Sequence, residues 1–591
     1  MNTADLDQGT TRCPAPLRDV IAEAFAASPL LAGLDPSQLD AEALHCRSLQ
    51  AGDCLFEQGE DGDHAYLIVQ GILGLYRTDL GMERRLFRKA SRGNLIGEYA
   101  LLCGEPRSAK AEAITDCLLV VIDQRTLDRL LTTFPFLQRR LIRQLAMAAS
   151  HGRHEDLAVQ PMVLVVAPSA ELSHDVEPSF TALIAAFAAM GAIEVVDHRH
   201  QDWPELEQTS SMISAVQDHR PTVFLVDRID RIHSAVRPLV GCFLLICNGN
   251  QLRREDVDSP EMMIDVLRVW PDDQIHPDRL ENSTELKGLR FLYNARLASS
   301  ADFLRVARCI LGKANILVLG GGGAKGFAHV GALKALEEKQ ALDIDMIYGV
   351  SIGALIGSLY ALERSVEEVR RELLSIFVDQ SPYSPTLPVH SLFRYNKGMR
   401  RIEALLKHHD VGDTWIPFRA GSVNITTNTM TYWHNQSLMS TVLASMSIPG
   451  MAPPVSMPDG GLYVDGAVLN NLPIFEARRH TSGKVIAISL DHGIHQRQLV
   501  RTGEMNAWIM KLLDRIGLAF RELPPITVTI MQSMLCSARS QSDVEEVFAD
   551  LMLKPNLTEV GLLDWAAHDK VEQEGYLEMG RVLESVPSIS S

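Results

Sequence analysis

The chain has 591 residues, of which 46% are hydrophobic and 22% are charged, a composition typical of globular proteins. Its 56 Lys and Arg residues against 74 Asp and Glu residues give a formal net charge of −18. This balance excludes a general electrostatic attraction to nucleic acid or anionic lipid, so we expect no nucleic-acid partner. Such a length exceeds what one hydrophobic core supports and predicts roughly four domains.

The start of the chain, MNTADLDQGTTRCPAPLRDV, has neither the basic nor the apolar region of a secretory signal. The longest apolar window, Thr181 to Ile193, is shorter than the ~20 residues that a membrane-spanning helix needs. We therefore expect a cytoplasmic protein without a transmembrane segment, which can still associate peripherally with a membrane.

Residues 1–27 are expected to form a tail, and residues 28–155 a first domain of short strands separated by Gly. Strand-forming runs lie on both sides of Gly71, and Cys117 to Asp123 forms another. This spacing predicts a small antiparallel barrel or roll with flanking helices.

The pattern then changes to alternating apolar strands and helices over residues 156–310. Buried parallel strands are expected at Met162–Val166, Thr222–Asp227 and Phe243–Cys247. No group of chemically active side chains is evident there, so we interpret this α/β domain as a spacer or docking domain. A second α/β domain is expected at residues 311–490, with a central, mostly parallel sheet and a mostly helical extension over residues 491–591.

The second α/β domain opens with an apolar strand, Ile316 to Leu319, and the loop GGGGAKGFAHVGAL, whose glycines fit the dinucleotide pattern G-x-G-x-x-G. A Walker phosphate loop needs Lys followed by Ser or Thr, whereas Lys325 is followed by Gly326. A dinucleotide fold predicts an acidic residue at the end of the second strand. Residues 349–351 read Gly-Val-Ser there, which leaves dinucleotide binding as a minor hypothesis.

The second strand, Ile344 to Gly349, runs into GVSIGALIGSLYAL, where Gly349, Ser351 and Gly353 form G-x-S-x-G. A strand, a turn of small residues and an apolar helix in succession are typical of a nucleophile elbow. Such an elbow exposes the serine oxygen at the C-terminal end of the strand. The alternative is a tight helix-packing turn with an incidental serine.

We interpret the glycine loop as an oxyanion hole. Backbone N–H groups at a helix N-terminus can stabilise an oxygen atom that becomes negative during a reaction. Glycine permits the positive φ angles and the close approach that such a loop needs. The predicted oxyanion loop comprises Gly321, Gly322, Gly323, Ala324, Lys325 and Gly326.

A serine nucleophile also needs a base. The segment PDGGLYVDGAVLNNLP places Asp465 directly after a predicted strand, Leu462 to Val464, and before Gly466. A carboxylate held at a strand end by a glycine turn can meet the elbow across the sheet edge. Asp459 also precedes a glycine but lies in a Pro- and Gly-rich loop, so Asp465 is the preferred candidate.

A histidine base is the rival interpretation, because hydrolases often order their triad Ser, acid, His. His480 and His492 lie downstream of Asp465 and could serve. His329 lies in the first turn of the helix after the glycine loop, where a packed or capping role is expected.

The glycine loop, G-x-S-x-G and D-G-A occur in this order between about Ala314 and Ala477, and together they resemble the patatin-like phospholipase family. The resemblance implies that Ser351 is the nucleophile and Asp465 its only protein partner, a Ser–Asp dyad without histidine. It also implies that no metal or organic cofactor is required, and that the segment ASMSIPGMAPPV (Ala444 to Val455) borders the site.

The first domain contains IGEYALLCGEPRSAKAEA, Ile96 to Ala113, which resembles the phosphate-binding segment of cyclic nucleotide-binding domains. The resemblance implies that cyclic AMP or GMP is a candidate regulator. The residues that it assigns to this ligand are Gly97, Glu98, Arg107 and Ser108. Two positions depart from the family pattern, because Ile96 replaces an aromatic residue and Lys110 replaces a small residue.

The three parts together resemble the neuropathy target esterase family, which acts on lysophospholipids and phospholipids. We therefore expect a serine lipid esterase that hydrolyses acyl ester bonds at a membrane surface. The alternative is a signalling or scaffold protein whose hydrolase site is vestigial. The sequence gives no indication of the oligomeric state.

Overall fold

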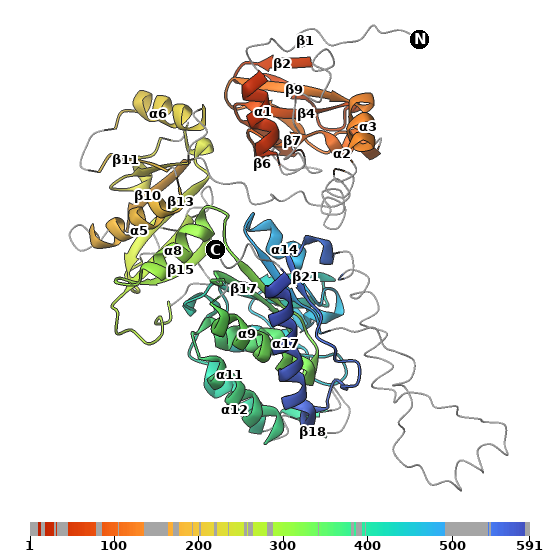
Figure 1. The fold of residues 1–591 in the computed structure, drawn as a ribbon. Helices are drawn as coiled ribbons and strands as arrows, with labels where there is room; N and C mark the ends of the chain where they lie inside the picture. The colour runs from red at the N-terminus through yellow and green to blue at the C-terminus, as the bar shows by residue number, and fades with distance from the viewer. Residues whose placement is uncertain are drawn as a thin grey trace, which may run out of the picture. The chain divides into compact units, whose positions relative to one another are not determined.

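A computed structural model of the chain (Figure 1) describes residues 10–12, 18–28, 31, 45–77, 85–103, 106–134, 137, 163–169, 177–191, 193–199, 203–217, 221–233, 236–252, 257, 264–280, 288–340, 342–379, 383–385, 393–395, 397–490, 542 and 545–585. The chain divides into two compact units. One unit contains Met1–Leu157, Gln201–Val223 and Ile232–Gly241, and the other contains the remaining residues.

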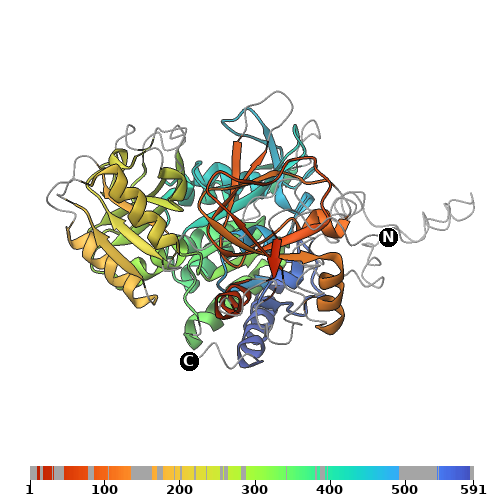
Figure 2. The ribbon, with the colours of Figure 1, turned by 90° about the horizontal axis from the view of Figure 1, so that it is seen from above.

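The N-terminal domain is a roll of antiparallel strands, coloured red to orange in Figures 1 and 2. Its elements are β1 (Thr10–Arg12), α1 (Arg18–Ala27), β2 (His45–Leu49), β3 (Cys54–Phe56), β4 (His64–Gln70), β5 (Leu73–Arg77), β6 (Arg85–Ala90), β7 (Leu95–Ile96), α2 (Glu98–Cys103), β8 (Lys110–Ala113), β9 (Cys117–Asp123) and α3 (Gln124–Thr133). The strand orders in the sheets are β1-β2-β9-β4-β7 and β3-β8-β5-β6. The predicted antiparallel roll is confirmed.

Strand β9 explains how this roll is held together. Its side chains alternate between two faces, as the period of two in a strand requires. Leu119 belongs to the apolar cluster that both sheets share, with Leu73 of the facing sheet. Val120 and Ile122 belong to a second cluster that includes Phe25 of α1. One strand therefore contributes to both cores of the domain.

The middle region contains a sheet with the strand order β11-β12-β10-β13-β14-β15. Its elements are β10 (Val163–Pro168), α5 (Glu177–Ala189), β11 (Glu194–Asp197), α6 (Glu205–Gln217), β12 (Thr222–Leu225), β13 (Cys242–Asn248), β14 (Ile264–Trp270), β15 (Leu289–Arg296) and α8 (Ser300–Ile310). Strands β10, β13, β14 and β15 pair in parallel. The predicted strands correspond to β10, β12 and β13, and most of the longest apolar window lies in α5.

The C-terminal domain is built on a larger sheet with the strand order β22-β23-β20-β17-β16-β24-β25, and β21 pairs with β20. Its strands are β16 (Ile316–Leu319), β17 (Met346–Val350), β20 (Phe418–Asn424), β21 (Thr429–Trp433), β22 (Val455–Ser456), β23 (Leu462–Asp465), β24 (Val485–Ile488) and β25 (Leu551–Leu553). A small hairpin pairs β18 (Tyr383–Pro385) with β19 (Phe393–Tyr395). Its helices include α9 (Phe327–Lys339), α10 (Ile352–Ala361), α11 (Val366–Leu373), α12 (Lys397–Leu406), α13 (Leu438–Ser445), α14 (Ile474–Arg479) and α17 (His568–Ser585).

The centre of this sheet is parallel and buried. Strands β20, β17, β16, β24 and β25 run in parallel, whereas β23 runs antiparallel to β20. All four residues of β16 are buried, because helices cover both faces of a parallel sheet. The carboxyl ends of parallel strands meet at one edge of a sheet. This edge therefore carries the glycine loop after β16 and Ser351 after β17, and β23 brings Asp465 to it.

Residues 545–585 belong to the same domain. Strand β25 pairs in parallel with β24, and α17 lies along α9 (Figure 1). The two helices approach closely at glycines: a Cβ atom at Gly331 would lie 1.9 Å from the carbonyl oxygen of Glu572. A Cβ atom at Gly575 would lie 2.1 Å from the carbonyl oxygen of Ala328. Among the helices that the structure describes, none combines the length and the apolar character needed to cross a bilayer.

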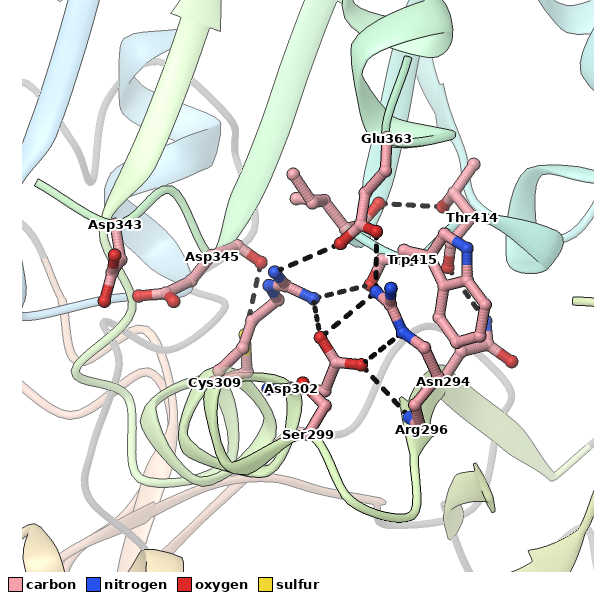
Figure 3. Close-up of polar contacts among 12 residues, drawn as sticks. Asn294, Arg296, Ser299, Asp302, Cys309, Asp343, Asp345, Glu363, Thr414 and Trp415 are labelled. Atoms are coloured by element: carbon pink, nitrogen blue, oxygen red, sulfur yellow. Dashed lines mark hydrogen bonds and ion pairs between the residues drawn. The ribbon is translucent and has the colours of Figure 1, made fainter. Parts of the chain in front are cut away.

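Polar contacts join the middle sheet to the C-terminal domain (Figure 3). The guanidinium of Arg296, which also contacts Asp302 of α8 at 2.9 Å, reaches Glu363 of the C-terminal domain at 2.6 Å. Asn294 donates to the carbonyl oxygen of Thr414 at 2.8 Å. A further ion pair, between Arg268 of β14 and Asp413, is completely buried.

Candidate active site

Ser351 lies at the turn between β17 and α10. Its backbone has φ 55° and ψ −123°, an uncommon conformation for a residue with a side chain. The flanking glycines make the turn possible. A Cβ atom at Gly349 would lie 2.6 Å from the Cα of Ala354, and one at Gly353 would lie 2.3 Å from the carbonyl oxygen of Leu319. The predicted strand, turn and helix are therefore present with the tight geometry of an elbow.

Asp465 ends strand β23 and faces Ser351. The hydroxyl of Ser351 donates to Oδ2 of Asp465 at 2.6 Å, and the backbone N–H of Ala467 donates to Oδ1 at 2.9 Å. The backbone N–H of Asp465 donates to the carbonyl oxygen of Ser447 at 2.9 Å. The residue is thus held through its backbone N–H and through Oδ1, while Oδ2 contacts the serine.

Burial changes the acidity of Asp465. Only 2% of the residue is exposed, and desolvation of its charged form raises the pKa from 3.8 to about 7. The hydrogen bonds from Ser351 and Ala467 act in the opposite direction, but they do not cancel the desolvation. A carboxylate with this pKa can accept a proton near neutral pH far better than an exposed one.

The carboxylate of the other acidic candidate, Asp459, forms hydrogen bonds within its own turn. It accepts hydrogen bonds from the hydroxyl of Tyr463 and, at 2.9 Å, from the backbone N–H of Gly461. The structure thus brings Asp465, rather than Asp459, to Ser351.

The glycine loop passes directly beside the serine. A Cβ atom at Gly321 would lie 2.9 Å from the Cβ of Ser351. The N–H of Gly321 donates to the side-chain oxygen of Asn471 at 3.0 Å. Gly323 has φ 57°, a left-handed conformation that favours glycine.

The predicted oxyanion donors differ in their availability. The N–H of Ala324 donates to the carbonyl oxygen of Leu562 at 2.8 Å, and the N–H of Lys325 donates to the carbonyl oxygen of Gly322 at 3.2 Å. Gly326 packs against Ile352, because a Cβ atom there would lie 2.4 Å from its Cγ1. Among the described residues, the N–H groups of Gly322 and Gly323 have no hydrogen-bond acceptor, and both residues are partly exposed.

His329 and His480 contact groups other than Ser351 and Asp465. Nε2 of His329 lies 2.8 Å from the carbonyl oxygen of Gly320, and burial lowers the pKa of His329 to about 4. A neutral His329 therefore donates this hydrogen bond and holds the start of the loop. His480 contacts Glu476 at 3.4 Å and stacks on Tyr348. His492 lies outside the described residues.

Ser445 is a residue of the site that the sequence did not single out. Its hydroxyl accepts the backbone N–H of Ser351 at 2.9 Å and donates to the carbonyl oxygen of Gly421 at 2.7 Å. Two residues later, Ser447 provides the carbonyl that holds Asp465. The end of α13 therefore fixes both members of the Ser351–Asp465 pair, and the predicted border segment, Ala444 to Val455, contains these residues.

In the N-terminal domain, Arg107 points into the roll. Its guanidinium donates to the carbonyl oxygen of Gly97 at 2.9 Å and to that of His64 at 2.8 Å, and lies 4.4 Å from the centre of the Phe56 ring. Its Nε is buried and has no hydrogen-bond partner in the part of the chain that the structure describes. A Cβ atom at Gly97 would lie 2.3 Å from this guanidinium, so glycine is needed there.

The remaining residues of the predicted nucleotide site lie around Arg107. Glu98 begins α2 and is nearly buried, whereas Ser108 is exposed. Lys110 forms ion pairs with Glu57 at 2.9 Å and Glu112 at 3.5 Å. Its ammonium group is therefore neutralised by protein carboxylates.

Comparison with known proteins agrees with this geometry. The family model of the patatin-like phospholipases matches residues 317–478, and that of the cyclic nucleotide-binding domain matches residues 46–134. The first range contains Ser351 and Asp465, and the second contains Arg107. Both resemblances predicted from the sequence motifs are thereby confirmed at the level of the family.

Several proteins are similar over most of this chain. It is 26% identical to the mouse (Mus musculus) "Patatin-like phospholipase domain-containing protein 6" over an alignment of 615 residues, gaps included. The alignment covers 90% of this chain and 44% of the mouse protein. The human (Homo sapiens) protein of the same name is 28% identical over 519 residues, covering 76% of this chain and 38% of the human protein. An "Uncharacterized NTE family protein" of Mycobacterium tuberculosis (strain ATCC 25618 / H37Rv) is 24% identical over 593 residues, covering 95% of this chain and 96% of that protein.

The chain spans less than half the length of these mammalian relatives, but nearly the whole length of the mycobacterial one. It combines a patatin-like phospholipase domain with an N-terminal cyclic nucleotide-binding domain, and its homologues include patatin-like phospholipase domain-containing proteins and proteins of the NTE family.

Proposed function

We propose that the protein is a serine lipid esterase that hydrolyses acyl ester bonds of lysophospholipids or phospholipids through Ser351 and Asp465. The observation that carries this proposal is the 2.6 Å hydrogen bond from the hydroxyl of Ser351 to the buried carboxylate of Asp465. The family and the mammalian relatives support phospholipid esters as the substrate class, since their names describe patatin-like phospholipases.

In the first half of the reaction, the Ser351 hydroxyl oxygen attacks the carbonyl carbon of the ester, and Asp465 takes the hydroxyl proton. The carbonyl oxygen becomes negative, and the N–H groups of Gly322 and Gly323 stabilise it. Such donors each lower a barrier by about 2.7–4 kcal/mol in serine hydrolases. The ester C–O bond then breaks, and the alcohol leaves with the proton from Asp465, so that the acyl group remains on Ser351.

In the second half, Asp465 is again a carboxylate and removes a proton from a water molecule. The water oxygen attacks the acyl carbon, and the same two amides hold the second oxyanion. The bond to Ser351 breaks, the serine oxygen takes the proton from Asp465, and a fatty acid leaves. These steps use one carboxyl group in turn as base and acid, and they require neither a metal nor an organic cofactor.

The test is fatty-acid release from a panel of lysophospholipids and phospholipids, measured by mass spectrometry with wild-type protein and the Ser351→Ala variant. We expect release by the wild type and a loss of about 10³-fold or more in the variant. Equal release by both proteins contradicts the proposal. No release by the wild type from any lipid favours a signalling or scaffold protein with a vestigial site.

We further propose that the N-terminal domain is a regulatory module with cyclic AMP or GMP as the candidate ligand. The family match over residues 46–134 and the inward position of Arg107 support this role. Two of the guanidinium donors are already bound to carbonyl oxygens, so we expect weak binding. Calorimetry with each nucleotide on the full chain and on the Arg107→Ala variant tests it. Binding that persists in the variant contradicts the proposed site.

A further inference from the structure

Asn471 connects the segment of the acid to the loop of the oxyanion donors. It lies six residues after Asp465 and is buried. Its side-chain oxygen accepts the N–H of Gly321 at 3.0 Å, and its side-chain NH₂ donates to the carbonyl oxygen of Gly321 at 3.2 Å. One carboxamide therefore binds both polar backbone groups of a single loop residue.

Gly321 also packs closely against the nucleophile, Ser351. A Cβ atom at Gly321 would lie 2.6 Å from the side-chain oxygen of Asn471 and 2.9 Å from the Cβ of Ser351. The loop residue is thus enclosed between Asn471 and Ser351, with no room for a side chain. The donors that follow, Gly322 and Gly323, continue from this fixed point.

We infer that Asn471 is a positioning residue, which holds the glycine loop at the distance from Ser351 that oxyanion stabilisation needs. This inference rests on the proposed esterase function. It also assigns the N–H of Gly321 to Asn471 rather than to the substrate, so that Gly322 and Gly323 supply the oxyanion donors.

An asparagine side chain matches the hydrogen-bonding groups of Gly321. A carboxamide offers a donor and an acceptor on neighbouring atoms, which matches the N–H and C=O of one residue. An ionised carboxylate offers acceptors only, and an alanine offers neither. A displacement of catalytic groups by about 1 Å can lower a rate about 100-fold.

The first test is the Asn471→Ala variant, assayed on p-nitrophenyl butyrate, a water-soluble ester. We expect kcat to fall by about 100-fold with an unchanged KM, because the contact acts on the transition state. The matched control is Asn470→Ala, which removes a buried asparagine that contacts Glu545 and the backbone of Leu472. The control should lower the melting temperature and leave kcat unchanged.

The second variant, Asn471→Asp, has nearly the same shape and therefore preserves packing. When protonated, the new carboxyl can donate to the carbonyl oxygen of Gly321 and accept its N–H, as the asparagine does. When ionised, it loses the donor. Because the position is buried, we expect the pKa of the new carboxyl to lie well above its ordinary value. The ratio of the variant's kcat to that of the wild type should therefore rise towards one as the pH falls and decrease as the pH rises.

The outcomes separate the inference from the proposed function. A wild type that neither hydrolyses the ester nor reacts with a fluorophosphonate removes the proposed function, and the inference with it. An active wild type with an unchanged kcat in Asn471→Ala overturns the inference alone. The inference is also overturned if Asn471→Ala and Asn470→Ala lose kcat in proportion to their loss of melting temperature. It is likewise overturned if the ratio of the kcat of Asn471→Asp to that of the wild type does not vary with pH.

Discussion

The hydroxyl of Ser445 accepts the backbone N–H of Ser351 at 2.9 Å, and it donates to the carbonyl oxygen of Gly421 at 2.7 Å. Ser445 and Ser351 are 94 residues apart in the sequence. The contact satisfies a buried N–H at the strained turn and fixes the direction in which the serine side chain points. The position of the nucleophile thus depends on a second serine, which is fully buried.

Replacing this second serine should impair both stability and reactivity. In Ser445→Ala the buried N–H of Ser351 loses its acceptor, which costs about 1–3 kcal/mol of unfolding free energy. We expect the same variant to react more slowly with a fluorophosphonate at Ser351. Urea unfolding and the labelling rate measure the two effects. The control is Ser358→Ala, which removes a buried hydroxyl bonded to Leu355 in the same helix as the elbow, and should not change the labelling rate.

The pH dependence of hydrolysis should follow Asp465. Its carboxyl must be ionised to accept the serine proton, and burial raises its pKa to about 7. We therefore expect kcat/KM for a soluble ester to rise about tenfold per pH unit below this pKa and to level off above it. A profile that is already flat from about pH 5 upwards would mean that the base has an ordinary carboxyl pKa.

The same carboxyl should make the protein less stable at high pH. Its folded pKa of about 7 exceeds the reference value of 3.8, so the folded state binds this proton more tightly than the unfolded state. Burying the charged carboxylate lowers the free energy of unfolding. This loss is absent below the reference pKa of 3.8 and is complete above the folded-state pKa of about 7. We expect Asp465→Asn to be more stable than wild type above pH 7, by at most on the order of 4 kcal/mol. Urea unfolding at several pH values tests this, and a difference that grows as the pH falls contradicts it.

Two glycines of α17 should respond oppositely to the same substitution. In Gly575→Ala, the new Cβ would lie 2.1 Å from the carbonyl oxygen of Ala328, so α17 must move away from α9. We expect a loss of about 3 kcal/mol, because overpacking against backbone cannot be relieved by a rotamer change. In Gly580→Ala the nearest atom is the flexible Nζ of Lys339 at 3.5 Å, and helix propensity should add up to about 1 kcal/mol.

Thermal unfolding of both variants provides the measurement. Equal effects of the two substitutions would contradict the close packing of α17 on α9. A loss of esterase activity in Gly575→Ala, without a loss in Gly580→Ala, would connect this packing to the glycine loop.

The elements that carry chemistry were predictable from local patterns. The run Ile316 to Leu319 is a buried strand, and the glycines around Ser351 mark a turn that larger residues cannot make. Asp465 follows an apolar run and precedes a glycine, which is typical of a strand end. Each of these signals lies within about ten residues, where the periodicity of a strand or helix and the conformational freedom of glycine decide the structure.

The residues that position this chemistry were not predictable in the same way. The contacts of Ser445 and Asn471 cross 94 and 150 residues of sequence, and a single serine or asparagine has no periodicity. Gly575 lowers helix propensity locally, yet the close packing of two helices requires it. Arg268 is a charged residue inside a buried strand, and partners far away in the sequence account for it: an ion pair with Asp413 and a hydrogen bond to the carbonyl oxygen of Gly412.

The most direct test of the Ser351–Asp465 pair is the rate of covalent labelling of Ser351 by a fluorophosphonate, followed by peptide mass spectrometry in wild type and in Asp465→Asn. Asparagine cannot take the serine proton, so we predict labelling of Ser351 in the wild type and a rate at least about 100-fold lower in the variant. Labelling of Ser351 at the wild-type rate in Asp465→Asn, or a wild type that is not labelled at Ser351, would contradict the account.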